Sequence, residues 1–284
     1  MPTTTTTTTH HDVTVTYDIT SPTPTAPGLV LIHGTGADRT QWAPLTARLS
    51  DRFTVLAPDL SGSGGTTDPG GPLTVADLAD EVIAAADHAG LERFHLAGHS
   101  LGAAVAAHLA GTRPGRVRSL ALHAGWAYTD TRMAAELRYW LELLRTDAAH
   151  GTDLFVRMVP LMAFGPRYWE RTDEAAHEAL VRTLAGVISP TAAARQTETD
   201  LGVDLRPLLG RITAPTLVLA SAHDRLIDAA QQDALLTGIA DARYAEIDAG
   251  HGAPGEDPEG FAAKLAAFLD ERAEAEAEAE VAAV

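Results

Sequence analysis

Apolar positions along the chain gather in short β-rich runs, which are separated by longer stretches with helical periodicity. The runs that we interpret as strands are Val13–Ile19, Gly28–His33, Phe53–Asp59, Arg93–Gly98, Val117–His123, Thr216–Ser221 and Arg243–Ile247. Residues 29–32 and 217–219 are apolar at every position, which is typical of strands buried on both faces. This alternation predicts an α/β fold with a mostly parallel central sheet and helices on both faces.

One interval, residues 124–215, is too long to be a structureless loop in a compact domain. Apolar side chains recur within it at helical spacing and predict helices over Met133–Leu144, Leu154–Phe164 and Tyr168–Ile188. We therefore expect residues 126–205 to form a helical cap over the C-terminal edge of the sheet. Residues 13–125 and 206–272 then make up the core.

Both ends of the chain have a biased composition. Residues 1–12 are rich in threonine and are expected to be a disordered tail, whereas residues 273–284 form an Ala/Glu-rich tail that could extend the last helix. The first residues lack the apolar core of a secretory signal, and no apolar stretch reaches the roughly 18 residues of a membrane span. We expect a cytoplasmic protein with no membrane partner.

Composition narrows the possible chemistry. The 284 residues are 45% apolar, which is enough for a large core in two domains or in one elaborated domain. The 21 basic and 38 acidic residues give a net charge of −17, which repels phosphate backbones and argues against a nucleic-acid partner. The chain contains no cysteine, which excludes disulfides, a thiolate nucleophile and cysteine-ligated metals.

The strongest local signal is a G-x-S-x-G motif, Gly98-His99-Ser100-Leu101-Gly102, between a predicted strand and an alanine-rich predicted helix. That context is the one the motif requires, because glycines at both ends let strand and helix approach closely around a strained turn. The turn holds the hydroxyl of Ser100 clear of the backbone. Ser100 is therefore the candidate nucleophile.

A neutral serine is a weak nucleophile and needs a base and an acid that orients the base. Asp224 follows the strand Thr216–Ser221, and His251 follows the strand Arg243–Ile247, so the chain order is Ser, Asp, His. Two other acids compete with Asp224. Asp228 is explained by capping the helix that begins at Ala229, and Asp130 lies near the start of the insert.

Backbone donors for an oxyanion are expected in His33-Gly34-Thr35-Gly36, directly after a buried strand. The glycines there free N–H groups to face a developing negative charge. We predict the N–H of Thr35 as one donor, with those of Gly34 and Gly36 as alternatives, and that of Leu101, next to the nucleophile, as the other.

With these residues in place, the sequence from about residue 13 to 270 resembles the α/β-hydrolase fold superfamily of serine hydrolases, and within it small bacterial esterases, enol-lactone hydrolases and carbon–carbon bond hydrolases. The resemblance implies a helical cap inserted after the sixth core strand of the family, which corresponds here to the run that ends at His123, the fifth of the predicted runs. The sequence departs from the family at Ser61. Many relatives carry an arginine at this position, two residues after the aspartate that corresponds to Asp59. We therefore expect the salt bridge of that arginine to be absent.

Other residues support weaker expectations. Trp126, Met158, Met162 and Phe164 could line a substrate pocket, although core packing explains them equally well. His99 is expected to pack beside the sheet. No H-E-x-x-H pattern accompanies the histidines, so we expect no metal, and no feature requires a cofactor.

These features favour a serine hydrolase that cleaves an ester, thioester or lactone of a small organic molecule through an acyl-enzyme on Ser100. The same residues would serve carbon–carbon bond hydrolysis or a non-hydrolytic acyl transfer, cyclisation or elimination, because function lies in the site and not in the fold. A binding protein that keeps the fold without turnover is a third hypothesis. A serine at position 100 argues against dehalogenases and epoxide hydrolases of this fold, which use a carboxylate nucleophile. The sequence does not predict the oligomeric state.

Overall fold

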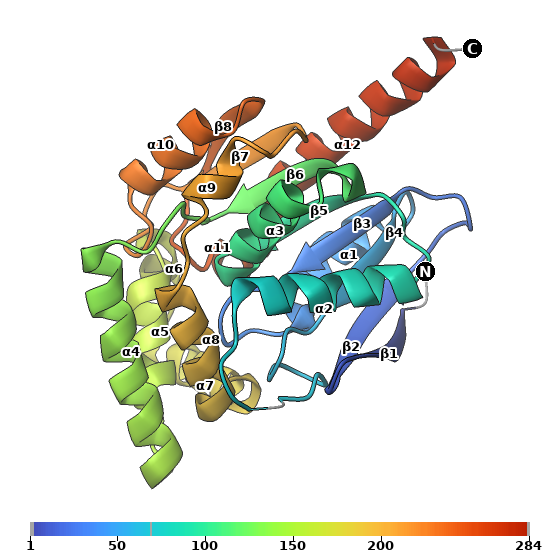
Figure 1. Cartoon of the computed structure of the whole chain (residues 1–284). Coiled ribbons are helices and arrows are strands. Elements are labelled where there is room, and N and C mark those ends of the chain that lie inside the picture. The colour runs from blue at the N-terminus through green and yellow to red at the C-terminus, as the bar shows by residue number, and fades with distance from the viewer. Residues whose placement is uncertain (1–2, 69, 283–284) are drawn as a thin grey trace.

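The structure, a computed structural model, describes residues 3–68 and 70–282. Its centre is an eight-stranded sheet with strand order β1-β2-β4-β3-β5-β6-β7-β8 (Figure 1). β1 and β2 are antiparallel to their neighbours, and the remaining strands are parallel. The strands are β1 Thr4–His10, β2 Val13–Thr20, β3 Gly28–Ile32, β4 Thr54–Pro58, β5 Phe94–His99, β6 Val117–His123, β7 Thr216–Ser221 and β8 Ala242–Ile247.

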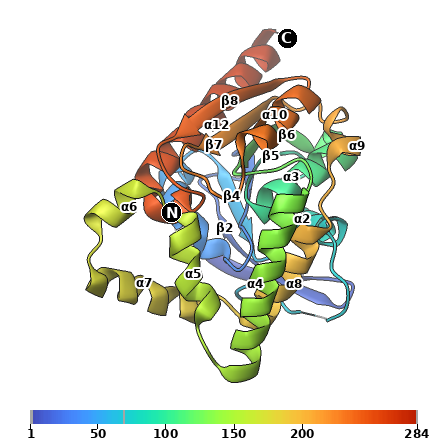
Figure 2. The ribbon, with the colours of Figure 1, turned by 90° about the vertical axis from the view of Figure 1, so that its left-hand side faces the viewer.

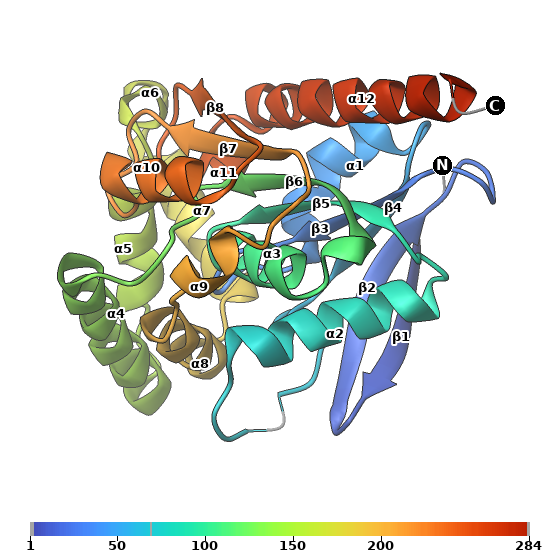
Figure 3. The ribbon, with the colours of Figure 1, turned by 45° about the horizontal axis from the view of Figure 1, so that its top comes forward.

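Helices cover both faces of this sheet, which confirms the predicted layers (Figure 3). α1 and α12 pack on one face, and α2, α3 and α10 pack on the other, so that two separate apolar clusters are buried. The helices of the core are η1 Arg39–Trp42, α1 Ala43–Leu49, α2 Val75–His88, α3 Leu101–Thr112, η2 Pro114–Arg116, α9 Arg206–Leu209, α10 Ala229–Gly238, α11 Ala253–Glu256 and α12 Pro258–Ala282. Within the described ranges, none of the helices combines the length and apolarity needed to cross a membrane.

The two ends of the chain are more regular than their composition indicates. Residues 4–10, expected to be part of a disordered tail, form β1 along the edge of β2. The physical reason is that threonine is β-branched and favours extended backbone, and the free edge of β2 supplies hydrogen-bond partners. α12 continues through the Ala/Glu-rich segment to Ala282, while residues 1–2 and 283–284 lie outside the described residues.

Six described helices lie between β6 and β7 in the chain. The first five of them lie beyond the C-terminal ends of the parallel strands (Figure 2). We call these five the insert. Their bounds are α4 Thr131–His150, α5 Leu154–Ala163, α6 Pro166–Arg171, α7 Glu174–Val187 and α8 Pro190–Leu201. The run predicted over 168–188 is split in two, because Asp173 caps a new helix through its side chain. α8 was not predicted, since its buried residues include Gln196, Thr197, Thr199 and Asp200, and no apolar stripe marks it.

The loop after β4 keeps an ion pair despite the serine at position 61. Asp59 pairs with Arg39 of η1, which also contacts Asp18 at 2.9 Å. Ser61 instead donates its hydroxyl to Glu81 of α2, where burial raises the pKa of the carboxyl group to about 7. The salt bridge of an arginine at position 61 is absent, as Ser61 leads one to expect, and Asp59 takes its guanidinium partner from a different segment.

Candidate active site

Ser100 lies at the sharp turn between β5 and α3. Its backbone has φ 54° and ψ −121°, a conformation rarely adopted by a residue with a side chain. The two flanking glycines are required by contact: a Cβ on Gly98 would lie 2.1 Å from the carbonyl oxygen of Gly102, and one on Gly102 would lie 2.1 Å from that of Ile32. The motif thus stores strain in order to place the serine hydroxyl above the sheet edge.

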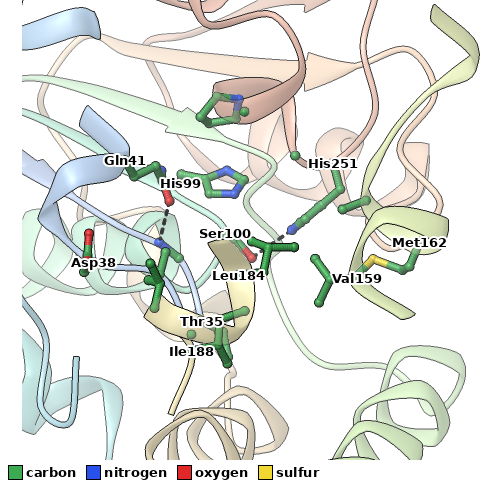
Figure 4. A pocket seen from close by; sticks show the side chains of 18 of the residues that line it. Thr35, Asp38, Gln41, His99, Ser100, Val159, Met162, Leu184, Ile188 and His251 are labelled. Atoms are coloured by element: carbon green, nitrogen blue, oxygen red, sulfur yellow. Dashed lines mark hydrogen bonds between the residues drawn. The ribbon is translucent and has the colours of Figure 1, made fainter. Parts of the chain in front are cut away.

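Ser100, His251 and Asp224 form a continuous hydrogen-bonded chain (Figure 4 shows its first link). The Nε2 atom of His251 is 3.0 Å from the Oγ of Ser100, and its Nδ1 atom is 2.9 Å from Oδ2 of Asp224. The Oδ1 atom of Asp224 accepts the N–H groups of Leu226 and Ile227, both at 2.9 Å. The carboxylate is therefore held from one side by backbone and aims its other oxygen at the imidazole.

The electrostatics of this chain favour a charged acid and a basic histidine. Burial alone raises the pKa of Asp224, but the adjoining His251 and the two backbone donors outweigh it, so the pKa is lowered. Burial likewise opposes the charged form of His251, but the Asp224 carboxylate outweighs burial and raises the pKa of the imidazole. An arrangement of this kind can take a proton from a serine hydroxyl and hold it on the histidine.

The two competing acids have other roles in the structure. Asp130 accepts the N–H of Met133 and caps α4, and Asp228 accepts the N–H of Gln231 and caps α10. Each N-cap satisfies a helix donor that would otherwise lack an acceptor.

The backbone N–H groups of the loop after β3 differ in whether they have an acceptor. The N–H of Gly34 is bound by Gln41, 3.4 Å away, and the N–H of Gly36 by Gln196, 2.8 Å away. The N–H of Thr35 has no acceptor among the described residues, and that of Leu101 is the first of α3, where no intrahelical acceptor exists. Of the two N–H groups predicted as oxyanion donors, those of Thr35 and Leu101, neither has a hydrogen-bond acceptor among the described residues.

Two polar residues of α8, one turn apart, connect this loop to the insert by hydrogen bonds. Gln196 accepts from Gly36 and donates through Nε2 to the carbonyl oxygen of Ser61 and the hydroxyl of Ser63, both at 3.0 Å. Asp200 accepts the hydroxyl of Thr35 at 2.7 Å. Burial raises the pKa of Asp200 to about 7, against the lowering effect of the Thr35 hydrogen bond. The sequence offered no signal for this pair beyond polar residues at i and i+4.

A pocket of about 260 Å³ opens above Ser100 between core and insert. The core side is polar and includes Gln41 and His99, while the insert side is apolar and includes Val159 and Met162 (Figure 4). The complete apolar wall consists of Trp140, Phe155, Val159, Met162, Ala163, Phe164, Leu184, Val187 and Ile188.

Of the four residues predicted for the pocket, Met162 and Phe164 line it. Met158 packs against the larger apolar cluster, because the pocket-facing stripe of α5 runs through Phe155, Val159 and Met162. Trp126 is buried in the same cluster and donates its indole N–H to the hydroxyl of Thr129 at 3.0 Å.

Comparison with known proteins identifies the family and several proteins that this chain resembles. Residues 27–258 match the family model described as alpha/beta hydrolase fold. Pyrrolizixenacetamide deacetylase of Xenorhabdus hominickii is 36% identical over 86% of this chain and 91% of its own length. The enol-lactonase of Burkholderia xenovorans LB400 superposes with a TM-score of 0.80 and is 27% identical, covering 93% of this chain and 100% of its own. A hydrolase from Pseudomonas aeruginosa PA01 gives 0.81 and 26%, over 93% and 98% of the two chains.

Proposed function

Since the chain belongs to the α/β-hydrolase fold family, we propose that it is a serine hydrolase that cleaves an ester, thioester or lactone of a small organic molecule. The observation that carries the proposal is the chain of hydrogen bonds from Ser100 through His251 to Asp224, directly beneath a pocket. We assign these residues as nucleophile, base and orienting acid.

In the proposed reaction, the Oγ of Ser100 attacks the acyl carbon as Nε2 of His251 takes the hydroxyl proton. The negative charge that develops on the acyl oxygen is stabilised by the N–H groups of Thr35 and Leu101. His251 then donates its proton to the leaving group, which leaves an acyl-enzyme on Ser100. Water, deprotonated by the same histidine, releases the acid and restores the serine.

The insert acts as the cap in this proposal. Its apolar side chains form the wall opposite the polar core side of the pocket, so they would hold the hydrocarbon part of a substrate and exclude bulk water. A pocket of about 260 Å³ fits a small molecule and not a polymer chain. The division into a core of residues 13–125 and 206–272 and a cap of residues 126–205 remains a prediction.

Removal of an acetyl group from an amide nitrogen is a second candidate. It is favoured by the 36% identity to a protein named as a deacetylase, whose match extends over most of both chains. Amide cleavage uses the same acyl-enzyme but requires His251 to protonate a poorer leaving group.

The test is labelling with a fluorophosphonate, followed by mass spectrometry of the labelled peptide. We expect modification at Ser100, and no modification in Ser100→Ala or His251→Ala. Purified protein is then offered esters, thioesters, lactones and acetamides of matched size. A folded protein that neither reacts with the phosphonate nor releases acid from any of them would contradict the proposal.

A further inference from the structure

His99 ends β5, next to Ser100 in the chain, and belongs to a second buried chain of hydrogen bonds. Its Nδ1 atom lies 2.8 Å from Nδ1 of His123, the last residue of β6, and the two rings are nearly parallel with centroids 4.9 Å apart. The Nε2 atom of His123 lies 3.0 Å from the hydroxyl of Ser221 at the end of β7. Three neighbouring strands thus each contribute one member.

The number of protons on each ring decides which atom is the donor in each hydrogen bond of this buried chain. Burial, together with the neighbouring imidazoles, lowers the pKa of His99 well below its usual value and that of His123 to about 3, so each ring is neutral and carries one proton. A contact between two ring nitrogens needs one proton between them. The remaining question is which ring supplies it.

Ser221 decides the direction. Its hydroxyl proton has no acceptor among the described residues other than Nε2 of His123, and a buried hydroxyl without an acceptor is costly. Ser221 therefore donates to His123, whose own proton lies on Nδ1 and is donated to Nδ1 of His99. The single proton of His99 is then on Nε2.

The ring that carries this Nε2–H group lines the pocket, and its Nε2 has no partner within the part of the chain that the structure describes. Gln41 lies beside it: a Cβ on Gly34 would come within 3.0 Å of the His99 ring, and the N–H of the same Gly34 is bound by the Oε1 of Gln41. The Nε2 of Gln41 is buried without an acceptor among the described residues. Gln41 and His99 thus lie side by side at one side of the site (Figure 4), and the Gln41 amide, whose Nε2 is covered, has to turn to reach a substrate.

We propose that His99 and Gln41 form a subsite for a second hydrogen-bond acceptor on the substrate, such as a ketone or amide carbonyl near the scissile acyl group. The inference rests on the proposed function and narrows its substrate class to acyl compounds with a second carbonyl. Among the described residues, the pocket wall includes no lysine or arginine, so the subsite suits a neutral oxygen and not a carboxylate.

The test compares pairs of 4-nitrophenyl esters that differ only by one ketone: pentanoate with 4-oxopentanoate, and hexanoate with 5-oxohexanoate. The readout is the ratio of kcat/KM between the two members of a pair, in which any general loss of activity cancels. We expect a ratio above one for at least one pair in the unmodified protein. His99→Asn keeps a partner for His123 but has no group at the Nε2 position, and should lower that ratio about tenfold, the effect of one hydrogen bond.

Matched variants distinguish a role of His99 as a hydrogen-bond donor from a role in packing. His99→Gln places an amide N–H where Nε2 was and should retain the ratio. Ser221→Ala removes the hydroxyl that orients His123 and should lower the ratio, whereas Ser221→Thr should retain it. ¹⁵N NMR of the histidine side chains of the unmodified protein should find the proton of His99 on Nε2 and that of His123 on Nδ1, independently of how any variant folds.

Three results would overturn the inference while leaving the proposed function intact: a ratio near one for both pairs, a ratio that His99→Asn does not change, or a His99 proton on Nδ1. In each of these cases the simple esters are still hydrolysed and Ser100 is still labelled. Absence of both hydrolysis and labelling would instead reject the proposed function, and the inference with it.

Discussion

The two walls of the pocket are built in different ways. On the core side, Ser100, Asp224 and His251 each follow a parallel strand, and the ends of those strands meet at one edge of the sheet. On the insert side, apolar side chains come from helices whose positions depend on packing against one another and on the core. Strand pairing thus fixes the chemistry, while helix packing shapes the space around it. Changes on the core side should abolish turnover, and changes on the insert side should alter which substrate is turned over.

The largest effect is expected for the nucleophile. Ser100→Ala should lower kcat for a 4-nitrophenyl ester by roughly 10⁴ to 10⁶, because it removes the atom that forms the acyl-enzyme in the proposed reaction. Circular dichroism should show an unchanged fold, since the substitution removes one hydroxyl. Ser21→Ala, at an exposed position far from the pocket, is the matched control and should keep the full rate. Near-normal turnover in Ser100→Ala would show that Ser100 is not the nucleophile.

The three acids offer the next test on the core side. Asp224→Asn should lower kcat about 10⁴-fold, because an amide cannot hold His251 in the tautomer that accepts the serine proton. Asp130→Ala and Asp228→Ala should keep most of the activity and instead lower the free energy of unfolding by about 1 kcal/mol each, the usual effect of losing an N-cap. Urea unfolding and initial rates measure the two quantities. A larger loss of rate in Asp130→Ala than in Asp224→Asn would reassign the acid.

The same contrast explains what the sequence could predict. The sequence predicts Ser100 from glycines whose spacing a strand-to-helix turn demands, and it predicts Asp224 and His251 from their positions directly after strands. No such local rule marks Gln196 and Asp200, because a helix with a buried polar face has no apolar periodicity to reveal it. Nor does sequence fix the rotation of a helix about its axis, which decides that Val159 faces the pocket while Met158 packs beneath it.

The contact between α8 and the loop after β3 is where the two walls meet, and its loss should have an intermediate effect. Gln196→Ala leaves the N–H of Gly36 and the carbonyl of Ser61 without partners, so the loop that carries Thr35 should become less ordered. We expect kcat to fall about tenfold and KM to change little. Thr197→Val is the control, since the hydroxyl of this buried neighbour bonds only within α8. Equal losses in both variants would mean that α8 contributes stability alone.

Asp200 should affect the pH profile. His251 accepts the serine proton only when neutral, so the rate rises with pH through the pKa of His251. Burial lowers that pKa, but the charge and hydrogen bond of Asp224 and, to a smaller extent, the charges of Glu136 and Asp200 outweigh burial and raise it above 6.5. The ascending limb of kcat/KM should therefore lie above pH 6.5 in the unmodified protein. Because burial raises the pKa of Asp200 itself to about 7, Asp200→Asn removes a carboxyl group that is only partly charged at this pH, and it should move the limb slightly to lower pH. A shift to higher pH would contradict the assigned electrostatics.

The smallest effect is expected on the apolar wall, where it should appear as selectivity and not as a loss of turnover. Val159 faces the pocket from α5, and Val159→Phe fills space that a longer acyl chain would occupy. Since each buried methylene contributes about 0.8 kcal/mol, displacing two of them should lower kcat/KM for an octanoyl ester about tenfold or more relative to an acetyl ester. Leu161→Phe adds a ring of the same kind on the exposed side of the same helix and should leave the ratio between the two esters unchanged. If Val159→Phe instead lowers both esters equally, the insert side would be supporting the chemistry and not selecting the acyl group, and the division between the two walls would fail.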